Sequence, residues 1–338
     1  MAAWSVVAVV VGSILIFGRD ILVPLAVAFI IWHLINALSR SYRRLRVGGW
    51  QLPDNLCLGM ALLTIAAAIY IIVLIAAGNV AQVAEAAPSY QANIDKILPA
   101  MLKFFGLDGL PTVSQALSQI DVPALIRSLA GAITTLAGSV GLIAIYILFF
   151  ILEQRSFDDK IAALFPDPNR ADRIRGILAD IESKIEAYLR IKTFVSLLTA
   201  ALCYLVLWYF GVDYQGFWAL VVFLFNFIPN VGSFLAVMFP VVLTLLQFAD
   251  FLTTAIVLVL LSAVQLAIGN FVEPRLMGSQ LNLSPLVIII SLAFWGSIWG
   301  LPGMFLCVPL TMIFTIVCAH FELTRPIAIL LSGSGKID

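Results

Sequence analysis

The sequence is poor in charged residues, and this shortage excludes a soluble protein. Charged residues make up 11% of the 338 residues and hydrophobic residues 62%, and the mean hydropathy is +1.07. A soluble domain carries about 25% charged residues, so an integral membrane protein is predicted. The 19 basic and 19 acidic residues cancel, which excludes the strong basic excess of a nucleic-acid-binding protein. The partners to expect are therefore the lipid bilayer and a small molecule or ion.

Enzyme motifs and metal-binding patterns are missing as well. The sequence contains no H-E-x-x-H, no P-loop and no G-x-S-x-G, so no enzymatic activity and no cofactor are predicted. Coupling to protons or Na⁺ stays open. None of the four cysteines belongs to a Cys-x-x-Cys pair, which argues against a metal site or a disulfide. They lie in or at the edge of apolar runs and are predicted to be buried: Cys57, Cys203, Cys307 and Cys318.

Apolar runs predict an all-α polytopic membrane protein with about six spans and two broken hairpins. A full span needs about 20 apolar residues. Short amphipathic helices are expected on both faces of the membrane. The predicted segments are transmembrane helices in 1–78, an extracytoplasmic helical segment 79–131, a span 132–152, a cytoplasmic helical segment 153–192, a transmembrane core 193–323 and a tail 324–338. The first 17 residues lack the basic start of a cleaved signal and are expected to form an anchor.

Basic residues predict the orientation. Of the 19 Lys and Arg residues, 15 fall in 39–55, 152–192, 273–284 and the C-terminal tail. The positive-inside rule therefore places these segments and both termini in the cytoplasm.

The two polar segments read as amphipathic helices. In 153–192, Asp167-Pro168 is a helix start, and apolar residues then recur at helical spacing up to Leu189. Asp180 with Lys184 and Glu186 with Arg190 stand at i, i+4. The apolar face fits an oligomer contact, a lever or a plain solvated helix. Because this face and that of 79–131 need cover, a homo-oligomer is predicted.

Two apolar runs are broken in the middle. The first reads F-N-F-I-P-N-V-G-S-F at 225–234, and the second reads W-G-L-P-G-M-F at 299–305. Broken backbone at membrane depth survives only where protein buries it or water reaches it. Paired interruptions are typical of transport sites, and each run is expected to form a hairpin that enters and leaves on one side.

Polar side chains gather around these breaks. Asn226, Asn230 and Ser233 predict an oxygen-rich patch for a small cation or a polyhydroxyl compound, although the amides could instead only satisfy the broken backbone. Glu273-Pro274-Arg275 fits a gate latch or proton carrier, or equally an interfacial charge pair. The predicted path comprises Asn226, Pro229, Asn230, Gly232, Ser233, Gln265, Asn270, Gly300, Pro302 and Gly303, and the predicted latch comprises Glu273, Pro274 and Arg275.

Several motifs, taken together, resemble the AI-2E transporter family, also called autoinducer-2 exporter-like or PerM-like. They are P-L-A-V-A-F at 24–29, Y-L-R-I-K-T at 188–193, N-F-I-P-N-V-G at 226–232, E-P-R-L-M-G at 273–278, N-L-S-P-L at 282–286 and G-L-P-G-M-F-L-C-V-P-L at 300–310. The resemblance implies a bacterial inner-membrane protein, a secondary transporter that exports a small polar molecule such as autoinducer-2. It also implies a homo-oligomer such as a pentamer. It also admits a Na⁺(Li⁺)/H⁺ antiporter. A non-transporting oligomeric scaffold is the alternative of another class.

Overall fold

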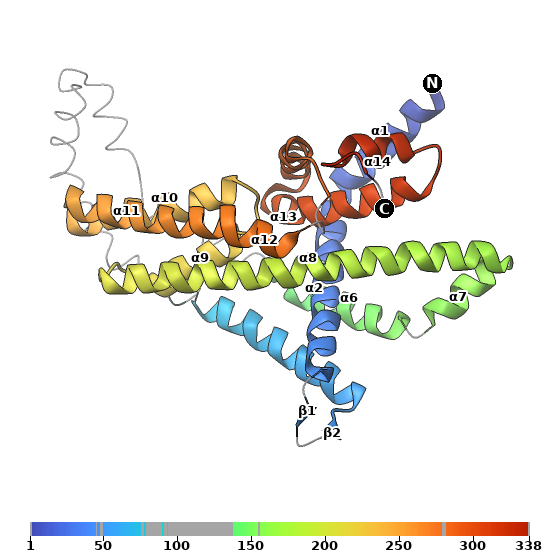
Figure 1. The fold of residues 1–338 in the computed structure, drawn as a ribbon, viewed down its shortest axis with the longest axis horizontal. Coiled ribbons are helices and arrows are strands. Elements are labelled where there is room, and N and C mark those ends of the chain that lie inside the picture. Colours follow the sequence, from blue (N-terminus) through green and yellow to red (C-terminus); the bar gives the residue numbers. More distant parts are fainter. Residues whose placement is uncertain are drawn as a thin grey trace. The chain divides into compact units, whose positions relative to one another are not determined.

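A computed structural model describes residues 2–44, 46–47, 50–75, 78, 90, 93, 138–154, 156–278 and 282–336 (Figure 1). The helices predicted in 79–131 lie outside these residues, apart from Tyr90 and Asn93. The two strands, β1 (Arg46–Val47) and β2 (Trp50–Gln51), form one antiparallel pair. The helices are α1 (Ala2–Phe17), α2 (Arg19–Arg43), an unlabelled helix Asp54–Ile75, α6 (Val140–Glu153), α7 (Phe157–Leu164), α8 (Pro168–Tyr209), α9 (Gln215–Phe225), α10 (Val231–Phe248), α11 (Phe251–Ala267), the π-helix η1 (Ile268–Val272), α12 (Glu273–Met277), α13 (Pro285–His320) and α14 (Arg325–Leu331).

Six helices among the described residues are long and apolar enough to cross a membrane. They span 19–43, 54–75, 168–209, 231–248, 251–277 and 285–320, and a seventh crossing is added if α6 and α7, which meet at 65°, count as one. The prediction of an all-α polytopic membrane protein is confirmed.

The chain divides into two compact units. Unit 1 contains Met1–Ala66, Ser139–Phe194 and Glu273–Asp338, and unit 2 contains Ala67–Gly138 and Val195–Val272. The first broken run therefore belongs to unit 2 and the second to unit 1. The domain boundaries predicted from the sequence stay a prediction.

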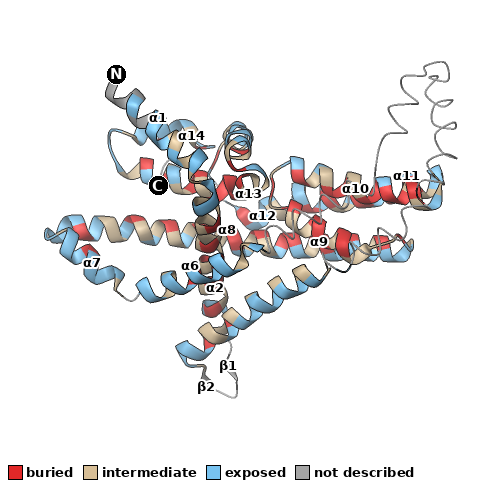
Figure 2. Cartoon of the chain, turned by 180° about the vertical axis from the view of Figure 1, so that it is seen from behind, coloured by how far each residue is buried: buried red, intermediate tan, exposed pale blue. Residues whose placement is uncertain are grey.

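The core of unit 1 joins α2, the helix that begins at Asp54, and α6. Small and β-branched side chains meet there, which lets the helices approach closely: Ala28, Ile35, Ala61, Ile143 and Ile147. Rings of Phe29, Trp32 and Phe150 pack beside them. In unit 2 the buried residues gather on α9 and α10 (Figure 2). The side chains of Phe217, Trp218 and Leu243 are almost fully buried there.

Helix α8 is continuous over 42 residues and begins at Pro168, as predicted from Asp167-Pro168. Asp167 caps it, because its Oδ1 accepts a hydrogen bond from the Asn169 N–H at 3.1 Å. The apolar face of its first half is buried within the chain itself, with Ile181 and Ile185 no more than 8% exposed. This face needs no second subunit for cover, so that argument for an oligomer fails, and the homo-oligomer stays a prediction.

Two local expectations meet different outcomes. The Asp180–Lys184 pair is confirmed at 3.1 Å. The expected i, i+4 ion pair between Glu186 and Arg190 is wrong, because Glu186 pairs with Arg40 of α2 instead. Sequence spacing favours the nearest partner, whereas packing of α2 against α8 brings a distant one. The four cysteines are free and buried, as predicted.

Candidate functional site

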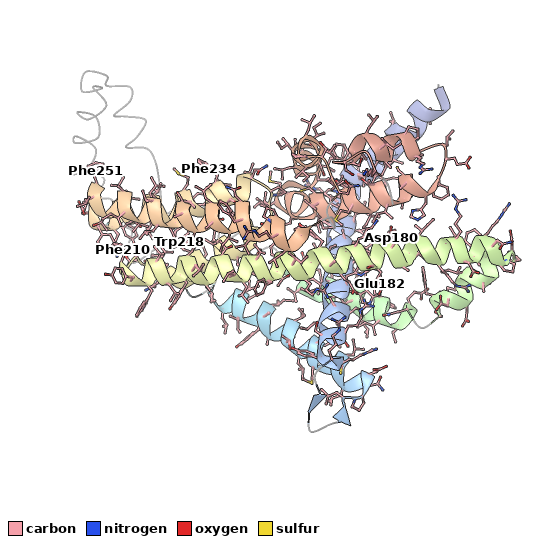
Figure 3. The ribbon with its side chains drawn as sticks, in the orientation of Figure 1. Asp180, Glu182, Phe210, Trp218, Phe234 and Phe251 are labelled. Carbon is pink, nitrogen blue, oxygen red and sulfur yellow. The ribbon has the colours of Figure 1, made fainter. Side chains whose placement is uncertain are left out.

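The first break is a tight helical hairpin in unit 2. Its first arm, α9, has 11 residues, about 16 Å, which is too short for a hydrocarbon core of about 30 Å. The second arm, α10, packs against it, with the Trp218 and Phe239 rings 6.3 Å apart. Trp218 is almost fully buried, whereas Phe234 of α10 is 63% exposed; both are labelled in Figure 3. The predicted hairpin is present, and its short first arm fits a segment that turns inside the membrane.

The second break is also a hairpin, in unit 1. Gly300 leaves helical geometry with φ 63° and ψ −140°, so α13 reverses direction there. The hydroxyl of Ser291 donates to the carbonyl oxygen of Cys307 at 3.0 Å, which ties two residues 16 positions apart on the two arms. At the tip, the Trp299 indole N–H donates to the carbonyl oxygen of Leu15 in α1 at 3.0 Å.

One glycine in each hairpin allows the two arms to approach. A Cβ atom on Gly232 would lie 1.8 Å from the carbonyl oxygen of Phe225, and one on Gly303 would lie 2.0 Å from that of Trp295. Real Cβ atoms essentially never come that close, and a main-chain carbonyl cannot move aside as a side chain does. Both positions therefore require glycine.

These glycines begin a short internal repeat that the sequence analysis missed. Residues 232–237 read G-S-F-L-A-V and residues 303–308 read G-M-F-L-C-V. The glycine and the last two residues are buried in both copies. A search for self-similarity across the two breaks would have found the pattern. Repeated hairpins of this kind are common in transporter folds.

The two asparagines around Pro229 have different surroundings. Asn226 is 5% exposed, and its Nδ2 donates to the fully buried hydroxyl of Ser196 in α8 at 3.0 Å. Asn230 is exposed and has a positive φ of 57°, which Asn tolerates better than most residues. Asn226 thus holds the hairpin against α8, while Asn230 and the half-buried Ser233 remain accessible.

Gln265 is the most unusual polar residue of α11. It is 9% exposed, and its Nε2 has no hydrogen-bond partner among the described residues. It shares one buried stripe with Val257 and Leu261 on a helix that packs against α10. An amide without a partner inside a span is costly, and such residues usually face a cavity or a pathway.

The backbone changes after Gln265. The helix widens to the π-helix η1, and Asn270 lies exposed within it. Pro274 follows; it has no N–H, and its ring would clash with the carbonyl of Asn270 in a regular helix. The wider turn accommodates that ring. π-Turns are frequent at functional sites.

Glu273 is paired with a residue that the sequence analysis did not consider. Lys192 Nζ of α8 lies 2.5 Å from Glu273 Oε1, and the two side chains are only 8% and 22% exposed. The interpretation of Glu273 and Arg275 as a charge pair is therefore wrong, and Arg275 is exposed. Lys192 and Glu273 stand just inside unit 1, close to the two points where the chain leaves for unit 2 and returns.

The predicted site residues thus fall into two groups. Unit 2 holds Asn226, Pro229, Asn230, Gly232, Ser233, Gln265 and Asn270, and unit 1 holds Glu273, Pro274, Arg275, Gly300, Pro302 and Gly303. Among the described residues no group of three or more His, Cys, Asp or Glu could hold a metal ion.

Comparison with known proteins gives a consistent result. Residues 5–322 match the model of the AI-2E family transporter. The chain is 31% identical over 326 residues to the AI-2 transport protein TqsA of Escherichia coli strain K12. The aligned region covers 95% of this chain and 92% of TqsA. It is 32% identical over 248 residues to a "Putative transport protein" of Borreliella burgdorferi, covering 73% of this chain and 68% of that one. It is 29% identical over 325 residues to the "Putative transport protein YhhT" of E. coli strain K12, and the aligned region covers 94% of this chain and 90% of YhhT.

Proposed function

Because the chain belongs to the AI-2E family of transporters, we propose that it exports a small polar molecule, and that autoinducer-2 is its substrate. The observation that carries the substrate is the similarity to TqsA over 95% of the chain. We place the protein in the bacterial inner membrane, with both termini in the cytoplasm and several copies in one assembly.

The proposed path runs along the two hairpins. Asn230, Ser233 and Gln265 offer hydroxyl, carbonyl and amide groups, which suit a small molecule rich in hydroxyls. Gln265 supports this role best, since its buried Nε2 has no partner among the residues that the structure describes, and a substrate or water can supply one. Asn226 acts indirectly, by fixing the hairpin to Ser196. Gly232 and Gly303 keep each hairpin thin enough for backbone to line the path.

Glu273 has a supporting part in this proposal. A cation/proton antiporter needs a carboxylate that exchanges its charge partner, whereas Glu273 is already paired with Lys192 in a mostly buried position. We propose that this ion pair is the latch predicted at Glu273-Pro274-Arg275, with Lys192 as the true partner.

The test is transport into inverted membrane vesicles that contain the protein. We expect accumulation of autoinducer-2 above the level of vesicles without the protein. Exchange of Na⁺ or Li⁺ for protons, with no autoinducer-2 uptake, would instead identify the antiporter. Absence of any flux from correctly folded protein would favour the non-transporting scaffold and refute the proposal.

A further inference from the structure

A polar pocket of about 390 Å³ lies within unit 1. It is formed where the end of α2, the start of the helix Asp54–Ile75, the end of α6 and the middle of the amphipathic half of α8 come together. None of the path residues lines it. The proposed path therefore leaves this pocket without a role.

One wall of the pocket consists of hydrogen-bond donors from α2. Asn36, Ser39, Arg40 and Arg43 stand at i, i+3, i+4 and i+7, so they share one face of the helix. Ser39 is 3% exposed, and its Oγ has no partner among the described residues. The buried Nδ2 of Asn36 likewise has no hydrogen-bond partner among the described residues. Buried polar atoms without a partner are unusual, and these two belong to residues that line the pocket.

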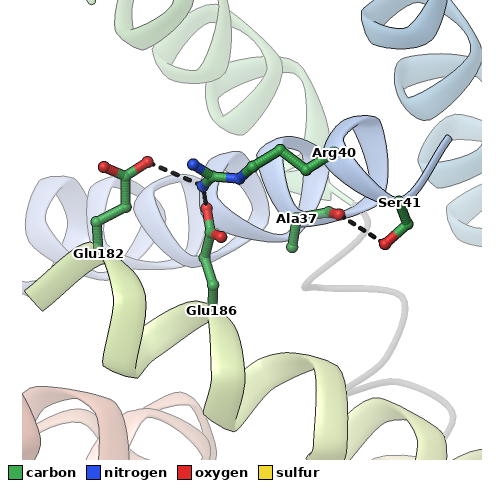
Figure 4. A network of polar contacts seen from close by, with 5 residues as sticks. All are labelled: Ala37, Arg40, Ser41, Glu182 and Glu186. Atoms are coloured by element: carbon green, nitrogen blue, oxygen red, sulfur yellow. Dashed lines mark hydrogen bonds and ion pairs between the residues drawn. The ribbon is translucent and has the colours of Figure 1, made fainter. Parts of the chain in front are cut away.

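A second wall, the acceptor wall, carries carboxylates, and these contact the arginines of the first. Glu182 Oε1 accepts from Arg40 Nη2 at 2.9 Å, and Glu186 behind it contacts the same guanidinium (Figure 4). Asp54 Oδ1 lies 3.1 Å from Arg43 Nε. The charged residues that line the pocket are thus two arginines and two carboxylates. A ligand with charge of one sign would meet repulsion from one wall, whereas a zwitterion complements both.

The pocket stands at the level expected for lipid headgroups. Arg43 is the last residue of a candidate span, Asp54 is the first residue of the next one, and Gln154 directly follows α6. Leu58 and Ile151 add an apolar side to the lining. Pockets between transmembrane helices at this level can hold lipid headgroups, as basic ones hold anionic headgroups.

We propose that this pocket binds an aminoalkyl phosphate, the zwitterionic headgroup of phosphatidylethanolamine. The phosphate lies on the donor wall, where the Nη groups of Arg43 donate to its oxygens. The primary ammonium lies on the acceptor wall and donates to Glu182 and Asp54. Free phosphoethanolamine has the same chemistry and is the other possible source.

The test is native mass spectrometry of the full-length protein with phosphatidylethanolamine or phosphatidylglycerol of identical acyl chains. Phosphatidylglycerol has the phosphate but no ammonium. We expect phosphatidylethanolamine to bind about tenfold tighter, the value of one charge-assisted hydrogen bond. Arg43→Gln should weaken its binding by a similar factor. Arg44→Gln, which removes the same charge from the neighbouring exposed residue outside the pocket, should not.

A second variant separates loss of recognition from loss of folding. Glu182→Gln keeps the side-chain shape and leaves Arg40 its contact with Glu186. It makes the pocket basic, so the preference should reverse in favour of phosphatidylglycerol, which a misfolded protein would not show. Release of the lipid by phosphoethanolamine would show that the headgroup alone suffices, and no release would assign the site to the membrane lipid. Equal binding of the two lipids by the parental protein, or unchanged selectivity in Arg43→Gln and Glu182→Gln, would overturn the proposal.

Discussion

Replacement of Gly303 by alanine is expected to force the two arms of the second hairpin apart. The added methyl group would lie 2.0 Å from the carbonyl oxygen of Trp295, 2.7 Å from its carbonyl carbon and 2.9 Å from the Cβ of Trp299. Two of these three atoms belong to the main chain, so relief requires the arm to move by more than an ångström. The Ser291–Cys307 bond between the arms would be strained by that movement.

The expected loss of stability is about 1–3 kcal/mol, the usual cost of overpacking, and at the upper end because no side chain can yield. Gly296 in the same hairpin is the matched control. A methyl group there would meet only the flexible side chain of Met304 at 3.0 Å. In a helix, Gly→Ala otherwise gains up to about 1 kcal/mol. Gly296→Ala should therefore be neutral or stabilising, and the two variants should differ in sign.

The assay is thermal unfolding in detergent, followed by autoinducer-2 transport per folded protein. Gly303→Ala should unfold at a lower temperature and transport poorly, while Gly296→Ala should match the parental protein in both. If Gly303→Ala were as stable and as active as Gly296→Ala, the close approach of the arms would not exist and the reasoning would be refuted.

Three further predictions concern the ion pair, a helix cap and the topology. Lys192→Met should lower the free energy of unfolding in detergent by about 3–5 kcal/mol, because it leaves Glu273 buried without its partner. The double variant Lys192→Met/Glu273→Gln should recover most of that loss. A double variant as unstable as the single one would contradict the role of the ion pair. Asp250 caps α11, and hydrogen bonds from the Thr253 hydroxyl and from main-chain N–H groups lower its pKa. The ionised Asp250 carboxylate therefore stabilises the fold fully above the ordinary pKa of Asp, and this stabilisation is lost as the pH falls through the lowered pKa. The unfolding temperatures of the parental protein and Asp250→Ala should therefore differ at about pH 7, and the difference should shrink as the pH falls below about 3.9, the ordinary pKa of Asp. A constant difference at all pH values would be evidence against the cap. A cysteine at Ser41 should be labelled only from the cytoplasm and one at Ser114 only from outside, and the reverse labelling would invert the orientation.

The sequence alone was sufficient for features that depend on local chemistry. Pro229 and Gly300 interrupt apolar runs, and the structure turns the chain at both places. Asp167-Pro168 marks the start of α8 because capping and the fixed φ of proline act on neighbouring residues.

Features that depend on packing were beyond such reasoning. Lys192 and Glu273 are 81 positions apart, and only the fold brings them together. The burial of Asn226 against Ser196, 30 positions away, has the same cause, since nothing local distinguishes it from the exposed Asn230. Gln265 was predicted to belong to the path, but only the placement of its neighbours shows that its Nε2 has no partner among the described residues.

The central claim is that polar groups along the hairpins carry a small polar substrate, and Gln265→Leu tests it most directly. Leucine removes a buried amide whose Nε2 has no partner in the described part of the chain, so this variant should be at least as stable as the parental protein. Lys160→Ala is the control, since it breaks only an exposed ion pair with Glu153, and such pairs contribute little. The measurement is the rate of autoinducer-2 transport per folded protein in vesicles. The account predicts that Gln265→Leu is stable and inactive while Lys160→Ala transports normally; transport by Gln265→Leu at the parental rate would contradict it.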